Sequence, residues 1–96
     1  MLNRWFHFDD DDGLTINLML DSNPGSVDLD FLYRQGSTMR QEIIDNPIFQ
    51  VSNMKMSFDY RGGNNCFESV TLKAEGVEDT REVREALGMM AMRTLR

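Results

Sequence analysis

The chain has few of the residues on which catalytic and cross-linked proteins depend. Its 96 residues contain one cysteine, Cys66, and one histidine, His7. A lone cysteine cannot form a disulfide within the chain, which agrees with a reducing compartment. No Ser/His/Asp set, Cys/His pair or zinc-ligand spacing is evident. We therefore expect no enzyme activity and no cofactor, with both residues in structural or surface roles.

Long apolar runs are also lacking. No stretch approaches the roughly 18 apolar residues of a membrane span, and residues 1–8 lack the apolar segment of a signal peptide. We expect a cytoplasmic protein, in the host cell cytoplasm if it is phage-encoded, that makes no membrane contact. The length and the 41% hydrophobic content suit one hydrophobic core. The expected organisation is a single α+β domain over residues 1–96.

Bases are scarce in the first third of the chain. The net charge is −6, and residues 1–33 hold seven acidic residues against Arg4 alone, whereas residues 34–96 hold nine of each sign. Polyanions are bound by Lys and Arg, so this acidic block disfavours nucleic acid as a direct ligand. It favours a partner protein with a basic surface, a cation, or solubility alone.

The strongest structural pattern lies in residues 5–20. Alternating apolar residues over 14–20 predict a strand with one buried face. Asp12 and Gly13 favour a tight turn after a short first strand at 4–8. We expect a hairpin that turns at four aspartates, with Phe6 and Phe8 buried.

The next segment is predicted to contain a third strand and a short helix. Over 27–34, Val27, Leu29, Phe31 and Tyr33 alternate with mostly polar residues, which indicates a strand that ends at Gly36. A helix is expected over 37–46, and Asn46-Pro47 is expected to end it.

The second half is predicted to hold two strands and a final helix. The strands are expected at 53–61 and 67–75. In the final helix, Asp79 and Glu82 have capping-box spacing, and Val83, Leu87 and Met90 form an apolar stripe that should close over the sheet. Gly88 suggests a close contact between this helix and the sheet. Nearby methionines could instead form an exposed patch, but core packing is the more common role.

These elements predict an α+β fold. We expect an antiparallel sheet of four or five strands with two helices on one face, in the order β-β-β-α-β-β-α. Residues 14–36 also show a weak correspondence with 54–76, which would indicate a ββα pseudo-repeat. Chance similarity between amphipathic hairpins explains it equally well.

The aspartate turn is a candidate metal site, because clustered carboxylates bind hard cations. An EF-hand loop with its glycine at Gly13 would place its end ligands at Phe8 and Met19, which cannot coordinate. We therefore expect no dedicated metal site. A weak Ca²⁺ or Mg²⁺ site and a solvated turn both remain open.

The predicted third strand supplies a second acidic group. Strand geometry would place Asp28 and Asp30 on one face, about 6.8 Å apart, beside Asn17 and Asp21. This predicts an acidic sheet face that binds a partner, although a solvated surface explains the pattern as well. The expected binding residues are Asp9, Asp10, Asp11, Asp12, Asp21, Asp28 and Asp30.

Two classes of function fit these features. The first is a small acidic module that binds a basic, nucleic-acid-handling protein, in the style of phage inhibitors such as anti-CRISPR proteins and DNA mimics, although no motif carries this comparison. The second is a structural or assembly protein, such as a homodimer or virion-associated subunit, that uses sheet edges and the Met-rich helix. Salt would weaken a charge-driven complex more than an apolar one.

Overall fold

The computed structural model describes residues 2–10, 13–20, 26–60 and 68–94. These residues form four strands and two helices in the order β-β-α-β-β-α. The elements are β1 Leu2–Asp9, β2 Gly13–Leu20, α1 Ser26–Asp45, β3 Asn53–Tyr60, β4 Glu68–Glu75 and α2 Arg81–Thr94.

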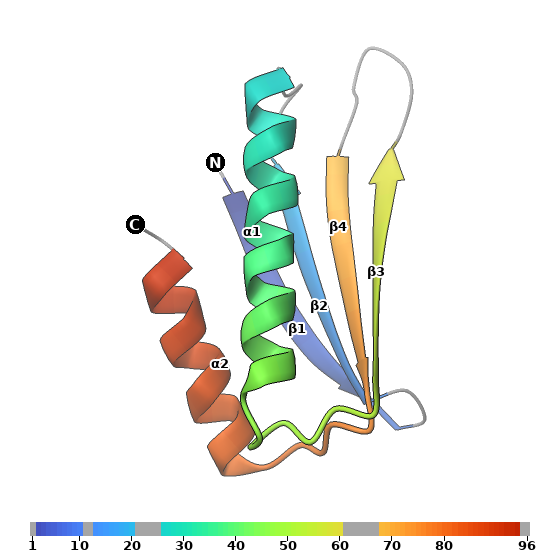
Figure 1. Cartoon of the computed structure of the whole chain (residues 1–96), viewed down its shortest axis with the longest axis vertical. Helices are drawn as coiled ribbons and strands as arrows, with labels where there is room; N and C mark the ends of the chain where they lie inside the picture. The colour runs from blue at the N-terminus through green and yellow to red at the C-terminus, as the bar shows by residue number, and fades with distance from the viewer. Residues whose placement is uncertain (1, 11–12, 21–25, 61–67, 95–96) are drawn as a thin grey trace.

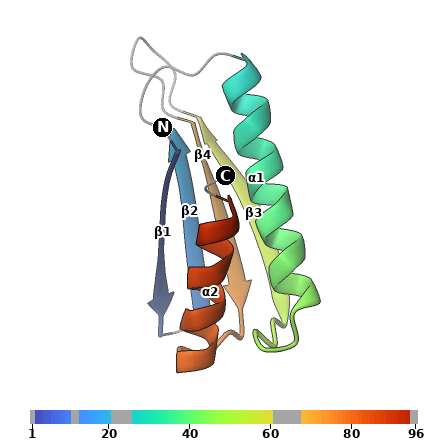
Figure 2. The same cartoon turned by 90° about the vertical axis from the view of Figure 1, so that its left-hand side faces the viewer.

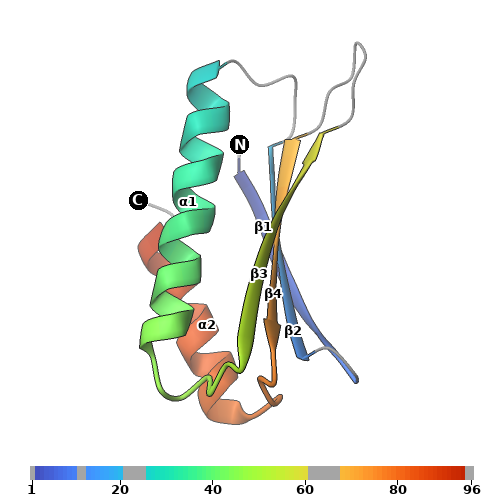
Figure 3. The ribbon, with the colours of Figure 1, turned by 45° about the vertical axis from the view of Figure 1, so that its right-hand side comes forward.

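The strands form one antiparallel sheet in the order β1-β2-β4-β3 (Figure 1). Both helices lie against the same face, and no described helix or loop covers the opposite face (Figure 3). We call these the helix face and the open face. The prediction of an antiparallel sheet with two helices on one face is therefore confirmed, with four strands.

The predicted third strand is wrong, because residues 26–45 form the single helix α1. Leu32, which does not fit the strand pattern, is fully buried, and so are Met39 and Ile43 further along the helix. Their spacing of seven and four residues places them on one helical face. The alternation before Tyr33 is therefore overridden by a helical period that continues through the segment.

Gly36 does not end a strand but lies inside α1, where the helix approaches β4. A Cβ atom at this position would lie 2.9 Å from Cγ1 of Val70, closer than carbon atoms pack. The missing side chain therefore lets the helix backbone rest on the centre of the sheet. As predicted, the helix stops before Asn46-Pro47.

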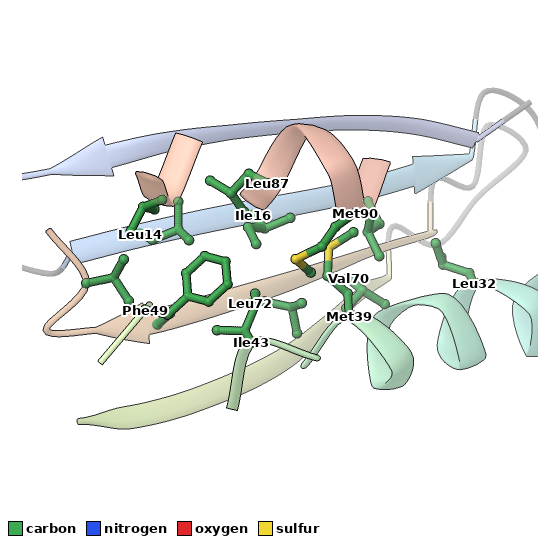
Figure 4. Packing of buried hydrophobic residues seen from close by; sticks show 14 of the residues in the cluster. Leu14, Ile16, Leu32, Met39, Ile43, Phe49, Val70, Leu72, Leu87 and Met90 are labelled. Carbon is green, nitrogen blue, oxygen red and sulfur yellow. The ribbon is translucent and has the colours of Figure 1, made fainter. Parts of the chain in front are cut away.

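The core lies between α1 and the two central strands. α1 packs most closely on β4, with β2 and β3 on either side. Figure 4 shows Ile16, Val70 and Leu72 of the sheet pointing toward Met39 and Ile43 of α1. Phe49, from the loop after α1, closes the lower end of this core and is almost fully buried.

The second helix, α2, lies beside α1 and over the β1 and β2 side of the sheet (Figure 2). Its predicted stripe of Val83, Leu87 and Met90 is buried. The β4 and β3 side of the same face is covered by α1.

Two details at α2 differ from the sequence expectation. The Thr80 hydroxyl accepts a hydrogen bond from the Val83 amide at 3.1 Å, so Thr80 caps the helix in place of Asp79. A Cβ atom at Gly88 would meet nothing within 4 Å. Gly88 therefore marks no close contact.

Phe6 also differs from its predicted burial. It lies on edge strand β1, and 39% of its surface is exposed. An edge strand has a neighbour on one side only, so the helices cover its side chains incompletely.

The elements follow the order ββα twice, but the correspondence between 14–36 and 54–76, an offset of 40 residues, is seen only in part. It pairs residues 26–36, which are helical, with residues 66–76, which include β4. At the same offset β2 coincides with β3, so the likeness holds for one strand and not for the ββα unit as a whole.

Candidate functional site

Four carboxylates gather at one end of the molecule, at the bottom of Figure 1. Asp9 ends β1 and Asp10 follows it, and Glu78 and Asp79 precede α2. All four line one open pocket of about 430 Å³. We call Asp9, Asp10, Glu78 and Asp79 the acidic end.

Two glycines bring the two acidic segments together. Gly13 and Gly76 have φ angles of 90° and 87°, which residues with a Cβ atom rarely adopt. A Cβ atom at Gly13 would lie 2.6 Å from the Ala74 carbonyl oxygen and 3.1 Å from the Gly76 nitrogen. This close backbone approach places the start of β2 against the loop that follows β4.

Asp79 is held by Arg84, one turn into α2. The Arg84 guanidinium donates two hydrogen bonds to the Asp79 carboxylate, at 2.5 and 2.9 Å. This hydrogen bonding lowers the pKa of Asp79 below its ordinary value and raises that of Arg84. Arg84 also lies over the Phe8 ring, 5.2 Å from its centroid, and so connects α2 to β1.

Asp9 is positioned by two neighbours on the open face. The Thr15 hydroxyl donates a hydrogen bond to Asp9 Oδ2 at 2.9 Å, and His7 Nε2 lies 3.3 Å from Asp9 Oδ1. The carboxylate stands between the hydroxyl and the imidazole. In a catalytic triad the imidazole must contact the hydroxyl directly, so this arrangement orients Asp9 and does not activate Thr15.

The predicted acidic sheet face does not form. Asp28 and Asp30 belong to α1, which lies on the helix face, and Asp30 forms an ion pair with Arg34. Asp11, Asp12 and Asp21 lie outside the described residues, as does Cys66. Of the predicted binding residues, Asp9 and Asp10 are therefore the two that the structure places together.

The open face carries mixed charge instead. Lys55 and Lys73 lie opposite each other on β3 and β4, and Lys55 also reaches Glu75 at 3.1 Å. Thr71 donates a hydrogen bond to the Asn17 side chain at 3.0 Å, across β4 and β2. Among the described residues, this face therefore carries no acidic stripe.

Neither a metal centre nor a membrane helix is found in the described part of the chain. Among those residues, no group of three or more His, Cys, Asp or Glu side chains is placed to hold a metal ion. The two helices, as far as they are described, are also too polar or too short to cross a bilayer.

The contribution of Glu78 and Asp79 was missed by sequence reasoning. They lie 68 residues or more after Asp10 and follow an ordinary strand, so nothing local connects them to the aspartate turn. A usable signal was the pair of glycines, because Gly13 and Gly76 each lie beside a group of carboxylates in the sequence.

Compared with models of protein families, with curated proteins and with solved structures, the chain matches none.

Proposed function

We propose that this protein is a small, non-catalytic binding module whose acidic end contacts a basic surface on a partner protein. The supporting observation is the convergence of Asp9, Asp10, Glu78 and Asp79 around one pocket. Asp11 and Asp12 continue the same acidic turn in the sequence. Opposite charge across an interface speeds association and selects the partner.

The arrangement favours a compact contact at one end of the protein over a flat acidic sheet. Asp79 is fixed by Arg84 and Asp9 by Thr15, so these carboxylates lose little side-chain freedom on binding. Asp10 and Glu78 are exposed. A target that handles nucleic acid presents a groove of Lys and Arg, which an acidic end of this kind would occupy and block. An inhibitor of such a target is the finer form of the proposal.

The test uses three immobilised versions of the full chain and a lysate of the native host. Wild type is compared with the double variant Asp10→Lys/Glu78→Lys and with Asp30→Lys, which reverses charge on α1 away from the acidic end. Proteins retained at about 0.1 M salt and released at about 0.5 M are identified by mass spectrometry.

We expect wild type and Asp30→Lys to retain a basic protein. The double variant should retain at least roughly tenfold less of it. Purified, that protein should lose nucleic-acid binding when wild type is added. Equal retention by all three versions, or retention that salt does not weaken, would contradict the acidic end as the binding surface.

A second candidate, a self-assembling subunit, is favoured by the exposed apolar residues at both sheet edges. Trp5 on β1 and Phe58 on β3 are 44% and 43% exposed, and Met89 on α2 is 65% exposed. Edge strands offer unpaired backbone groups to a second chain. Sedimentation equilibrium decides this point: a dimer or larger species that persists in high salt supports assembly, and a monomer at all concentrations removes it.

A further inference from the structure

A second hollow lies between α2 and the β1 side of the sheet, away from the acidic end. Its volume is about 270 Å³. Ile16, Met39, Leu87 and Met90 form its apolar wall, and all four belong to the buried core. The walls come from β1, β2, α1 and α2, so the hollow belongs to the fold and not to one loop. We call it the β1 pocket.

The pocket exists because β1 is an edge strand and α2 lies beside α1, the helix that packs on the central strands (Figure 2). α1 and the central strands fill the space between them, but α2 leaves the helix face of β1 only partly covered. Phe6, on that face, lines the pocket and stays partly exposed. The hollow is therefore open to solvent along β1.

Arg4 is the one charged residue among those that line the pocket. It shares the helix face of β1 with Phe6, because alternate residues of a strand point the same way. Burial lowers its pKa, since part of its surface has lost contact with water. Arg4 therefore gives the lining of an apolar hollow one positive charge, which matches a ligand that carries one carboxylate.

We propose that the β1 pocket binds a small apolar molecule with a single carboxylate, such as a medium-chain acid. Its apolar part lies among Ile16, Leu87 and Met90, and its carboxylate lies at Arg4. The volume is just below the range of about 300 to 1,000 Å³ typical of ligand pockets, so the ligand is small. Two methionines in the wall give it an adaptable shape.

The first experiment uses octanoate, octanol and octylammonium, which share a tail and differ in charge, below the concentrations at which they aggregate. Titrations follow the methyl signals of methionines labelled with ¹³C in the full chain. Octanoate is expected to shift Met39 and Met90. Met19, which lies on the open face, and exposed Met89 serve as internal controls.

The charge requirement is tested by affinity. Octanoate is expected to bind at least about tenfold more tightly than octanol, which corresponds to one hydrogen-bonded charge, and octylammonium most weakly. Arg4→Gln should reduce octanoate to the affinity of octanol. Lys55→Gln, which removes a charge from the opposite edge strand, should change nothing.

Leu87→Phe fills the pocket and should abolish binding of octanoate and octanol alike; if this variant does not fold, Arg4→Gln decides alone. Equal affinity for octanoate and octylammonium would overturn the proposal. So would shifts that spread to Met19, an unchanged affinity in Arg4→Gln, or no binding by any of the three probes. Displacement of octanoate by self-association would assign the pocket to a second copy of the chain and overturn it too.

Discussion

The two helices cover the same face of one sheet, but they differ in how they meet it. α1 rests on the centre of the sheet, and its buried residues include Leu32 and Ile43, which have no exposed surface. α2 lies toward an edge strand, with a pocket beneath it, and Gly88 lies on its solvent-facing side. One helix completes the core, whereas the other forms one wall of a pocket and positions part of the acidic end.

The difference follows from which strand each helix contacts. A central strand has neighbours on both sides, so a helix above it can bury a full apolar face against β2, β4 and β3. A helix toward the edge meets a sheet that ends. α2 therefore leaves a hollow over β1, and the same position brings Arg84 to Phe8 and Asp79.

Truncating a buried side chain should lower the free energy of unfolding more on α1 than on α2. Ile43→Ala should lower the free energy of unfolding by about 4 kcal/mol, near the top of the range for buried aliphatic residues. Leu87→Ala should cost about 2 kcal/mol, since its side chain already borders a hollow and loses fewer contacts. Urea denaturation of both variants measures the difference. A larger cost at Leu87 would show that α2 contributes at least as much to the core as α1.

Replacing each of the two helical glycines by alanine should change the free energy of unfolding in opposite directions, which is a sharper test. Gly36→Ala places a methyl group 2.9 Å from Val70 Cγ1 and should destabilise the protein by about 1 to 2 kcal/mol, because overpacking outweighs helix propensity. Gly88→Ala adds a methyl group in open space and should stabilise it by about 0.5 to 1 kcal/mol. Thermal and urea unfolding report both. Stabilisation by Gly36→Ala would contradict the close helix–sheet contact at α1.

The smallest effect concerns the pH dependence at α2. The pKa of Asp79 is lowered in the folded protein by its hydrogen bonds from Arg84. Its contribution to stability is therefore complete above the unfolded value of about 3.9 and is lost as the pH falls through the lower folded value. Asp79→Asn should therefore lower the urea midpoint near neutral pH, and its midpoint should match that of wild type at strongly acidic pH.

Glu78→Gln, one residue away, provides the matched control for this pH test. Its urea midpoint should follow wild type at every pH. A gap between Asp79→Asn and wild type that persisted in strong acid would mean that the carboxylate acts through packing and not through its charge.

Much of the sheet was predictable from local alternation. The hairpin over 5–20, the two later strands and α2 follow their apolar periods closely. α1 did not, because the residues before Tyr33 alternate like a strand over one short window. The helical period becomes visible only when Leu32, Met39 and Ile43 are taken together, and Gly36 breaks the pattern between them. A contact with Val70, far away in sequence, gives that glycine its place inside the helix.

The candidate site was predictable only in part for a related reason. Asp9 and Asp10 were identified because they adjoin a turn that is visible in the sequence. Glu78 joins them through the pairing of β2 with β4, which local patterns do not specify. The β1 pocket was missed altogether, since a hollow depends on where a helix comes to rest.

The strand order has a consequence for how the chain folds. β1 pairs with β2 and β3 with β4 across short connections, whereas Leu14 of β2 pairs with Ala74 of β4, 74 − 14 = 60 residues later. Closing a long loop costs more entropy than closing a hairpin, so non-local pairing is the slower step. Each half can therefore form its own hairpin first, and the seam between β2 and β4 closes when α1 packs across it. Amide protons along that seam should then report the cooperative opening of the whole domain, while those of β1 exchange through local fraying.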